Sequence, residues 1–80
     1  MIKEVQVFQG YSTILLQLWD LGNGTWEVSA TRFYRTYHGA RVEGSHTWTF
    51  QDLEAARKKA NGYYFWLRER GWKPVPKKRK

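Results

Sequence analysis

Polar and apolar residues alternate along much of the chain, with the period of two that is typical of β-strands. The alternation predicts strands over residues 2–9, 13–20, 25–37 and 45–50. It is clearest in the third segment, where Trp26, Val28 and Ala30 alternate with Glu27, Ser29 and Thr31. The sequence Gly22-Asn23-Gly24 favours a tight hairpin turn, and residues 39–44 are expected to form a second loop.

The alternation loses its phase within the third predicted strand. The run Arg32-Phe33-Tyr34-Arg35 gives each face of the strand one aromatic ring and one arginine. This pattern indicates either a β-bulge or a strand that runs beyond the core.

The period changes after residue 52. Apolar residues recur at helical spacing at Leu53, Ala56, Ala60, Tyr64 and Leu67. Asp52 is a good N-cap, and a glycine such as Gly71 commonly follows the last residue of a helix. We therefore predict a helix that begins after Asp52, ends before Gly71 and buries one apolar stripe.

These elements predict an α+β fold, in which an antiparallel sheet of four strands is covered on one face by a single C-terminal helix. A fifth strand is expected if the long third strand breaks. The helix should form the core with Trp26, Val28, Trp48 and Phe50, and the other sheet face should be exposed to solvent. Residues 1–75 are expected to be one domain, and residues 76–80 a basic, disordered tail.

The charge of the chain is divided between its two halves. The net charge is +7, yet Lys3 is the only one of fourteen Lys and Arg residues before residue 32. Residues 1–31 set Lys3 against Glu4, Asp20 and Glu27, a net charge of −2. Residues 32–80 hold thirteen basic and four acidic residues, a net charge of +9. Such segregation favours a surface that binds a polyanion.

Several classes of function find no support in the composition. The chain has no cysteine and two histidines, so we expect no metal site, no cofactor and no enzymatic activity. Its longest apolar run, residues 14–16, is far too short to span a membrane. We expect a cytoplasmic protein that does not bind membranes, associated with the nucleoid if it is bacterial.

Basic and aromatic residues are interleaved most densely around residues 32–41, a combination that favours nucleic acid. Arginines could contact phosphates there, and the rings could pack on sugars or bases. The alternative is an ordinary exposed hairpin with cation–π pairs. The candidate nucleic-acid-binding residues are Arg32, Phe33, Tyr34, Arg35, Tyr37, His38, Arg41, Lys58, Lys73, Lys77 and Lys78.

Three stretches carry a family resemblance: Ala30-Thr31-Arg32-Phe33-Tyr34-Arg35, Thr49-Phe50-Gln51-Asp52-Leu53-Glu54-Ala55-Ala56 and Arg70-Gly71-Trp72-Lys73-Pro74. Together they resemble the WGR domain of poly(ADP-ribose) polymerases and of bacterial stand-alone proteins. Phe33 and Tyr34 stand where that family has Trp and Gly, and Arg35 matches its Arg. The resemblance implies a sheet-plus-helix module that binds DNA, in some members at a strand end.

A second resemblance is to AP2-type domains and to the arm-binding domains of tyrosine integrases, which dock a three-stranded sheet in the major groove. Both resemblances imply double-stranded DNA as the partner. We therefore expect a non-enzymatic DNA-binding protein that uses the exposed sheet face and the loop after the third strand. The alternatives are a module that binds an acidic protein, or a binder of single-stranded DNA or RNA. Exposed aromatic residues also raise the hypothesis of a homodimer.

Overall fold

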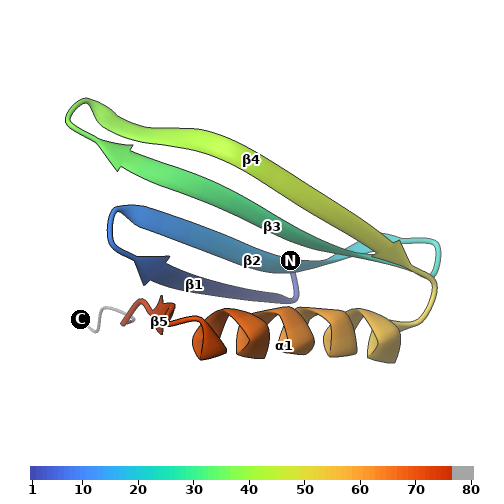
Figure 1. Ribbon diagram of the computed structural model, residues 1–80. Coiled ribbons are helices and arrows are strands. Elements are labelled where there is room, and N and C mark those ends of the chain that lie inside the picture. Colours follow the sequence, from blue (N-terminus) through green and yellow to red (C-terminus); the bar gives the residue numbers. More distant parts are fainter. Residues whose placement is uncertain (77–80) are drawn as a thin grey trace.

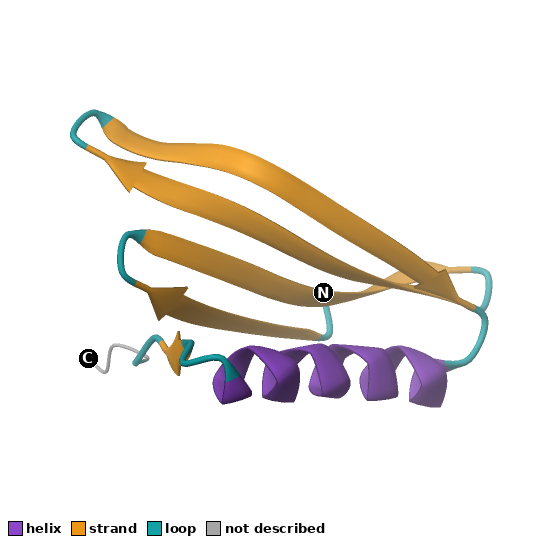
Figure 2. Cartoon of the chain, in the orientation of Figure 1, coloured by secondary structure: helices purple, strands orange, loops and turns teal. Residues whose placement is uncertain are grey.

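The computed structural model describes residues 1–76, which form a five-stranded antiparallel sheet with one helix across one face (Figure 1). The elements are β1 (Lys3–Gln9), β2 (Ser12–Gly22), β3 (Thr25–Thr36), β4 (Gly39–Phe50), α1 (Leu53–Glu69) and β5 (Lys73–Pro74). The strand order in the sheet is β4-β3-β2-β1-β5. The predicted α+β class and the helix on one sheet face are confirmed, as Figure 2 makes plain.

Helix α1 begins and ends where the sequence predicts. The side chain of Asp52 accepts a hydrogen bond from the backbone N–H of Glu54 at 3.3 Å, so it acts as the N-cap. At the other end Gly71 has a φ of +91°, a conformation that glycine adopts readily. The backbone N–H groups of Gly71 and Trp72 donate to the last turn of the helix, at 3.1 Å each.

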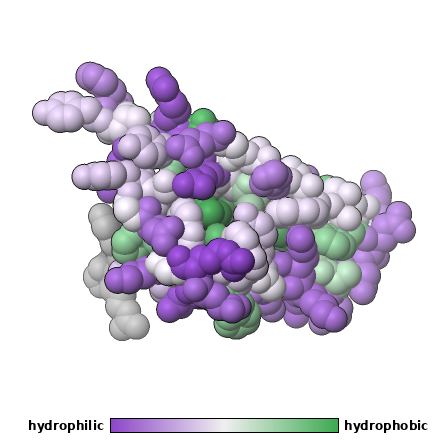
Figure 3. Space-filling view, viewed as in Figure 1, coloured by the Kyte–Doolittle hydropathy of each residue, from purple (hydrophilic) through white to green (hydrophobic). Residues whose placement is uncertain are grey.

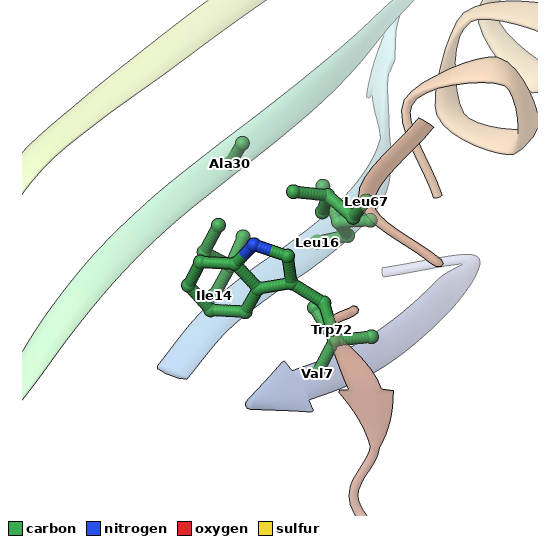
Figure 4. Close-up of a cluster of buried hydrophobic side chains, with 6 residues drawn as sticks. All are labelled: Val7, Ile14, Leu16, Ala30, Leu67 and Trp72. Atoms are coloured by element: carbon green, nitrogen blue, oxygen red, sulfur yellow. The ribbon is translucent and has the colours of Figure 1, made fainter. Parts of the chain in front are cut away.

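The core lies between α1 and the central strands, in two adjoining clusters. One contains Val7, Ile14, Leu16, Ala30, Leu67 and Trp72, and the other contains Leu18, Val28 and Ala56. Figure 4 shows the indole of Trp72 lying across Ile14, with Val7 and Leu67 beside it. Trp72 is only 6% exposed, so this residue, three positions after the end of the helix, closes the first cluster.

The predicted core is correct in position, but its members are buried to different degrees. Val28 is fully buried, whereas Trp26, Trp48 and Phe50 are half-buried and pack against the second cluster. For Trp48 and Phe50 the physical reason is strand order. Trp48 and Phe50 belong to β4, which is an edge strand with no neighbour on its outer side.

Two details of the predicted sheet are wrong. Residues 39–44 are not a loop, because β4 already begins at Gly39 and only residues 37–38 form the turn. The fifth strand does not come from a break in β3. It is β5, which pairs with the outer side of β1 through Val7 opposite Pro74 and Phe8 opposite Lys73.

The predicted irregularity near residue 32 is present, but the extra residue is in β4. Arg32 lies opposite Gly44 and Phe33 lies opposite Val42, which leaves Glu43 as the additional residue. Bulges increase the local twist of a strand pair. Beyond this bulge, the β3–β4 hairpin continues to the end of the sheet (Figure 1).

Candidate nucleic-acid interface

The basic residues gather at one end of the molecule because of how the elements are connected. The β1–β2 turn, the β3–β4 turn and the C-terminal end of α1 all lie at this end (Figure 1). We call it the basic end, and its charged residues are Arg32, Arg35, Arg41, Arg68, Arg70 and Lys73, with Glu43 and Glu69. Hydrophilic side chains project from the sheet at this end in Figure 3.

The opposite end of the molecule carries most of the acidic side chains. It contains the β2–β3 turn and the start of α1, with Asp20, Glu27, Asp52 and Glu54. Arg57 lies near it and forms an ion pair with Glu54, at 3.7 Å. Most acidic side chains therefore lie at one end and the arginines of β3, β4 and the last turn of α1 at the other, although Arg57 and Lys58 follow Glu54 on the helix.

The residues predicted to bind nucleic acid do not share one sheet face. Tyr34 lies opposite the buried Ser12, so Tyr34 and Arg32 are on the side that α1 covers. Phe33 and Arg35 alternate with them and are on the open side. On the open side of the sheet, Arg35 is the sole basic residue of the four long strands. This corrects the expectation that the basic surface lies on the exposed sheet face.

The side that faces the helix has a groove of about 400 Å³ between β3, β4 and the last turns of α1. We call it the aromatic groove, and its defining residues are Arg32, His46, Tyr63, Trp66, Arg70 and Trp72. Of these, sequence analysis proposed only Arg32. Its members come from distant parts of the chain, so the groove exists only in the folded molecule.

A row of aromatic rings leads into the aromatic groove. Successive ring centroids are 5.9 Å apart for His46 and Trp48, 5.6 Å for Trp48 and Tyr63, and 5.8 Å for Tyr63 and Trp66. Cations cover two of these rings. The Lys59 ammonium is 4.5 Å from the Trp48 ring centroid, and the Arg70 guanidinium is 3.8 Å from that of Trp66.

Helical spacing could have revealed part of this arrangement from the sequence. Lys59 and Tyr63 are four residues apart, as are Trp66 and Arg70, so each pair shares one face of a helix. The approach of His46 and Trp48 to Tyr63 could not be found in this way, because it depends on how β4 packs against α1.

Arg32 has a positioning role as well as a charge. Its Nε atom lies 3.2 Å from the Glu43 carboxylate, and its Nη2 atom donates to Ser12 Oγ at 3.3 Å. Its guanidinium also lies over the Trp72 ring, 5.5 Å from the centroid. These contacts hold Arg32 in the lining of the aromatic groove and partly neutralise it.

The other cations of the basic end are not neutralised in this way. Within residues 1–76, Arg35, Arg41, Arg68, Arg70 and Lys73 form no salt bridge with an acidic side chain. All five are exposed. Exposed cations without acidic partners are available to contact phosphates.

The tip of the β3–β4 hairpin is held by its own backbone and side-chain contacts. Thr36 Oγ1 donates to the Gly39 carbonyl at 2.8 Å and accepts from the His38 N–H at 3.3 Å. Tyr37 is fully exposed (101%), and its ring meets that of His38 edge to face. The Tyr37 phenol ring is therefore exposed to solvent on a turn that the hydrogen bonds of Thr36 hold in place.

Of the remaining predicted residues, Lys73 belongs to the basic end and Lys58 does not. Lys58 is exposed on the first half of α1, away from the basic end, and Lys73 is exposed in β5 beside β1. Lys77 and Lys78, together with the rest of the predicted tail at residues 77–80, lie outside the described residues.

Comparison with known protein families, characterised proteins and solved structures finds no match for this chain. The resemblance to WGR domains therefore stays a prediction. Among residues 1–76, no three His, Asp or Glu side chains are grouped so that they could hold a metal ion. The described part of the chain also has no helix with the length and hydrophobicity needed to cross a membrane.

Proposed function

We propose that this protein binds nucleic acid, and specifically double-stranded DNA, through its basic end. The observation that carries the proposal is the convergence there of exposed arginines without acidic partners and exposed aromatic rings. DNA carries closely spaced phosphates, and neutralising them releases counterions. A surface of this kind gains affinity from that release whatever the base sequence.

The shape of the β3–β4 hairpin supports a duplex as the partner. A two-stranded antiparallel ribbon is one of the forms that the major groove of DNA admits. Tyr37 is at the tip of this ribbon, and Arg35 and Arg41 lie behind the tip on opposite faces. Inserted into a groove, the ribbon would direct one arginine toward each of the two phosphate backbones.

The aromatic groove favours a second candidate, which is single-stranded DNA or RNA. Unpaired bases stack on aromatic side chains, and each stacked base contributes about 1–3 kcal/mol. Trp66 is 47% exposed at the rim of the groove, with the Arg70 guanidinium against its ring. The two candidates make different use of the molecule, because a duplex would contact the hairpin and a single strand would contact the groove.

Binding of a labelled duplex and of its separate strands, at two salt concentrations, tests the proposal. We expect the duplex to bind more tightly than either strand, with affinity that falls steeply as salt rises. Each lost phosphate contact should lower the slope of log affinity against log salt by about 0.9 for duplex DNA.

A charge-matched pair of variants locates the interface. Arg41→Ala should weaken duplex binding and lower the salt slope, because Arg41 is at the basic end. Arg57→Ala removes the same charge near the opposite end, where Arg57 is paired with Glu54, and should leave both quantities almost unchanged. Equal effects of the two variants would mean that net charge alone drives binding. Indifference of the protein to duplex and to single strands would instead indicate an acidic protein partner.

A further inference from the structure

Strand β4 leaves a long free edge on the sheet. It has twelve residues, and it is the last strand in the order β4-β3-β2-β1-β5. The other edge of the sheet is β5, which has two residues and includes Pro74. Short edge strands and prolines prevent further pairing, so the β5 edge is protected and the β4 edge needs a separate explanation.

The direction of the unpaired backbone groups follows from one hydrogen bond. The N–H of Arg35 donates to the Tyr11 carbonyl at 2.8 Å, so Arg35 points its backbone groups away from β4. The direction alternates along a strand, and Ala30 and Val28 therefore bond to their β4 partners, His46 and Trp48. The residues between these partners, Ser45, Thr47 and Thr49, direct their N–H and C=O groups outward to the free edge.

The two halves of β4 differ in how well they are protected. The half before the bulge contains Arg41 and Glu43, and both the charges and the bulge discourage pairing with another strand. The half after the bulge reads Ser45-His46-Thr47-Trp48-Thr49-Phe50, with no Asp, Glu, Lys, Arg or Pro. Threonines and aromatic residues make up most of this half, which therefore suits strand pairing.

We propose that residues 45–49 of β4 pair antiparallel with the same residues of a second copy of the chain, around a twofold axis at Thr47. The outward backbone groups would then bond Thr47 to Thr47 of the second copy, and Ser45 to Thr49 of the second copy. Two five-stranded sheets would become one continuous sheet. The seam is the strand edge, and it differs from the exposed aromatic rings that the sequence suggests for a homodimer.

Side chains are complementary across this axis. On the open sheet side, threonine would face threonine and serine would face threonine, which are pairs that stabilise adjacent strands. On the helix side, His46 would face Trp48 of the second copy, and the two residues already stack within one chain. No charged side chain belongs to the pairing segment itself, and the cation beside it is Lys59, whose ammonium lies 4.5 Å from the Trp48 ring centroid.

The antiparallel arrangement also separates the two basic ends. The β3–β4 turn at His38 is nine residues from Thr47, or about 30 Å along an extended strand. The two basic ends would therefore lie on opposite sides of the axis, well beyond the Debye length of about 8–10 Å at physiological ionic strength. Two copies with a net charge of +7 each can associate in this geometry with little repulsion.

Single-cysteine variants test the register directly, because the chain has no cysteine of its own. In Thr47→Cys, the two substituted residues would face each other with Cα atoms about 5.5 Å apart, within the range of a disulfide. In Thr49→Cys, the same strand and face are used, but the two sulfurs would be about 13 Å apart or more. We expect rapid disulfide formation for the first variant and none for the second. Equal cross-linking of both, or of neither, overturns the proposal.

Sedimentation velocity over a range of concentrations provides the second test. Thr47→Pro removes an outward N–H, which an edge strand tolerates, whereas Thr47→Ala keeps the N–H and shortens the side chain. We expect a concentration-dependent dimer for the unmodified protein and for Thr47→Ala, and a monomer with an unchanged circular dichroism spectrum for Thr47→Pro. A protein that is monomeric throughout, or a dimer that survives Thr47→Pro, refutes the seam. Neither result depends on whether the protein binds DNA.

Discussion

The two ends of this molecule share one sheet and one helix but are built differently. At the basic end, a buried tryptophan closes the core, and exposed arginines and rings surround it. At the opposite end, Trp26 and Phe50 are half-buried, and acidic residues cap the helix and hold a turn. Both ends have a packed core, but among the described residues exposed arginines without acidic partners and exposed aromatic rings are combined at the basic end only. That combination is the basis of the proposed interface with nucleic acid.

The largest difference between the ends should appear when a tryptophan is removed from each. Trp72→Ala opens a cavity beneath Arg32 and should lower the free energy of unfolding by about 3–5 kcal/mol. Trp26→Ala removes a half-buried ring and should cost about 1–3 kcal/mol. Chemical denaturation of the two variants measures both values. A smaller loss for Trp72→Ala would contradict the view that this residue closes the core.

Two glycine variants, one within α1 and one just after it, should change the stability of the protein in opposite directions. Gly71→Ala places a Cβ atom 3.0 Å from Gln9 Nε2 at a φ of +91°, and should destabilise the protein by about 1–2 kcal/mol. Gly62→Ala lies within the exposed part of the helix, where nothing obstructs a methyl group, and should stabilise it by about 1 kcal/mol. Thermal unfolding of both variants gives the comparison. Destabilisation by Gly62→Ala would be inconsistent with an open helix face at that residue.

The N-cap at the acidic end should have a moderate effect. Asp52→Ala loses the hydrogen bond to the Glu54 N–H, and should lower the free energy of unfolding by about 1 kcal/mol. Asp52→Asn keeps a side-chain oxygen acceptor and serves as the control. If the asparagine variant were as unstable as the alanine variant, charge rather than the hydrogen bond would explain the role of Asp52.

The smallest change in stability is expected at the hairpin tip. The Tyr37 side chain is fully exposed, so Tyr37→Ala should alter the free energy of unfolding by less than about 0.5 kcal/mol. The same variant should weaken duplex binding several-fold, because the ring lies at the tip of the proposed interface. Tyr11→Ala removes another exposed ring, from the β1–β2 turn at the same end. Comparing the loss of duplex affinity in the two variants shows which of the two turns contributes more to binding. An unchanged affinity for Tyr37→Ala would remove the tip from the interface.

Local patterns in the sequence were enough to predict most of the elements. The stripe of Leu53, Ala56, Ala60, Tyr64 and Leu67 identified α1, because side chains with helical spacing share one face whatever they pack against. The strands followed from alternation in the same way. Residues 39–44 misled the prediction, since two glycines in an exposed edge strand look like a loop when the neighbouring strand is unknown.

The sequence by itself determined the α+β class, the ends of the helix and the imbalance of charge between the two halves, since each depends on neighbours along the chain. The tertiary structure decided which face Arg32 and Arg35 occupy, that Trp72 is buried, and that His46 and Arg70 line the same groove. It also left β4 with a free edge. These features depend on strand order and register, which are set by contacts between residues far apart in sequence and leave no local pattern to read.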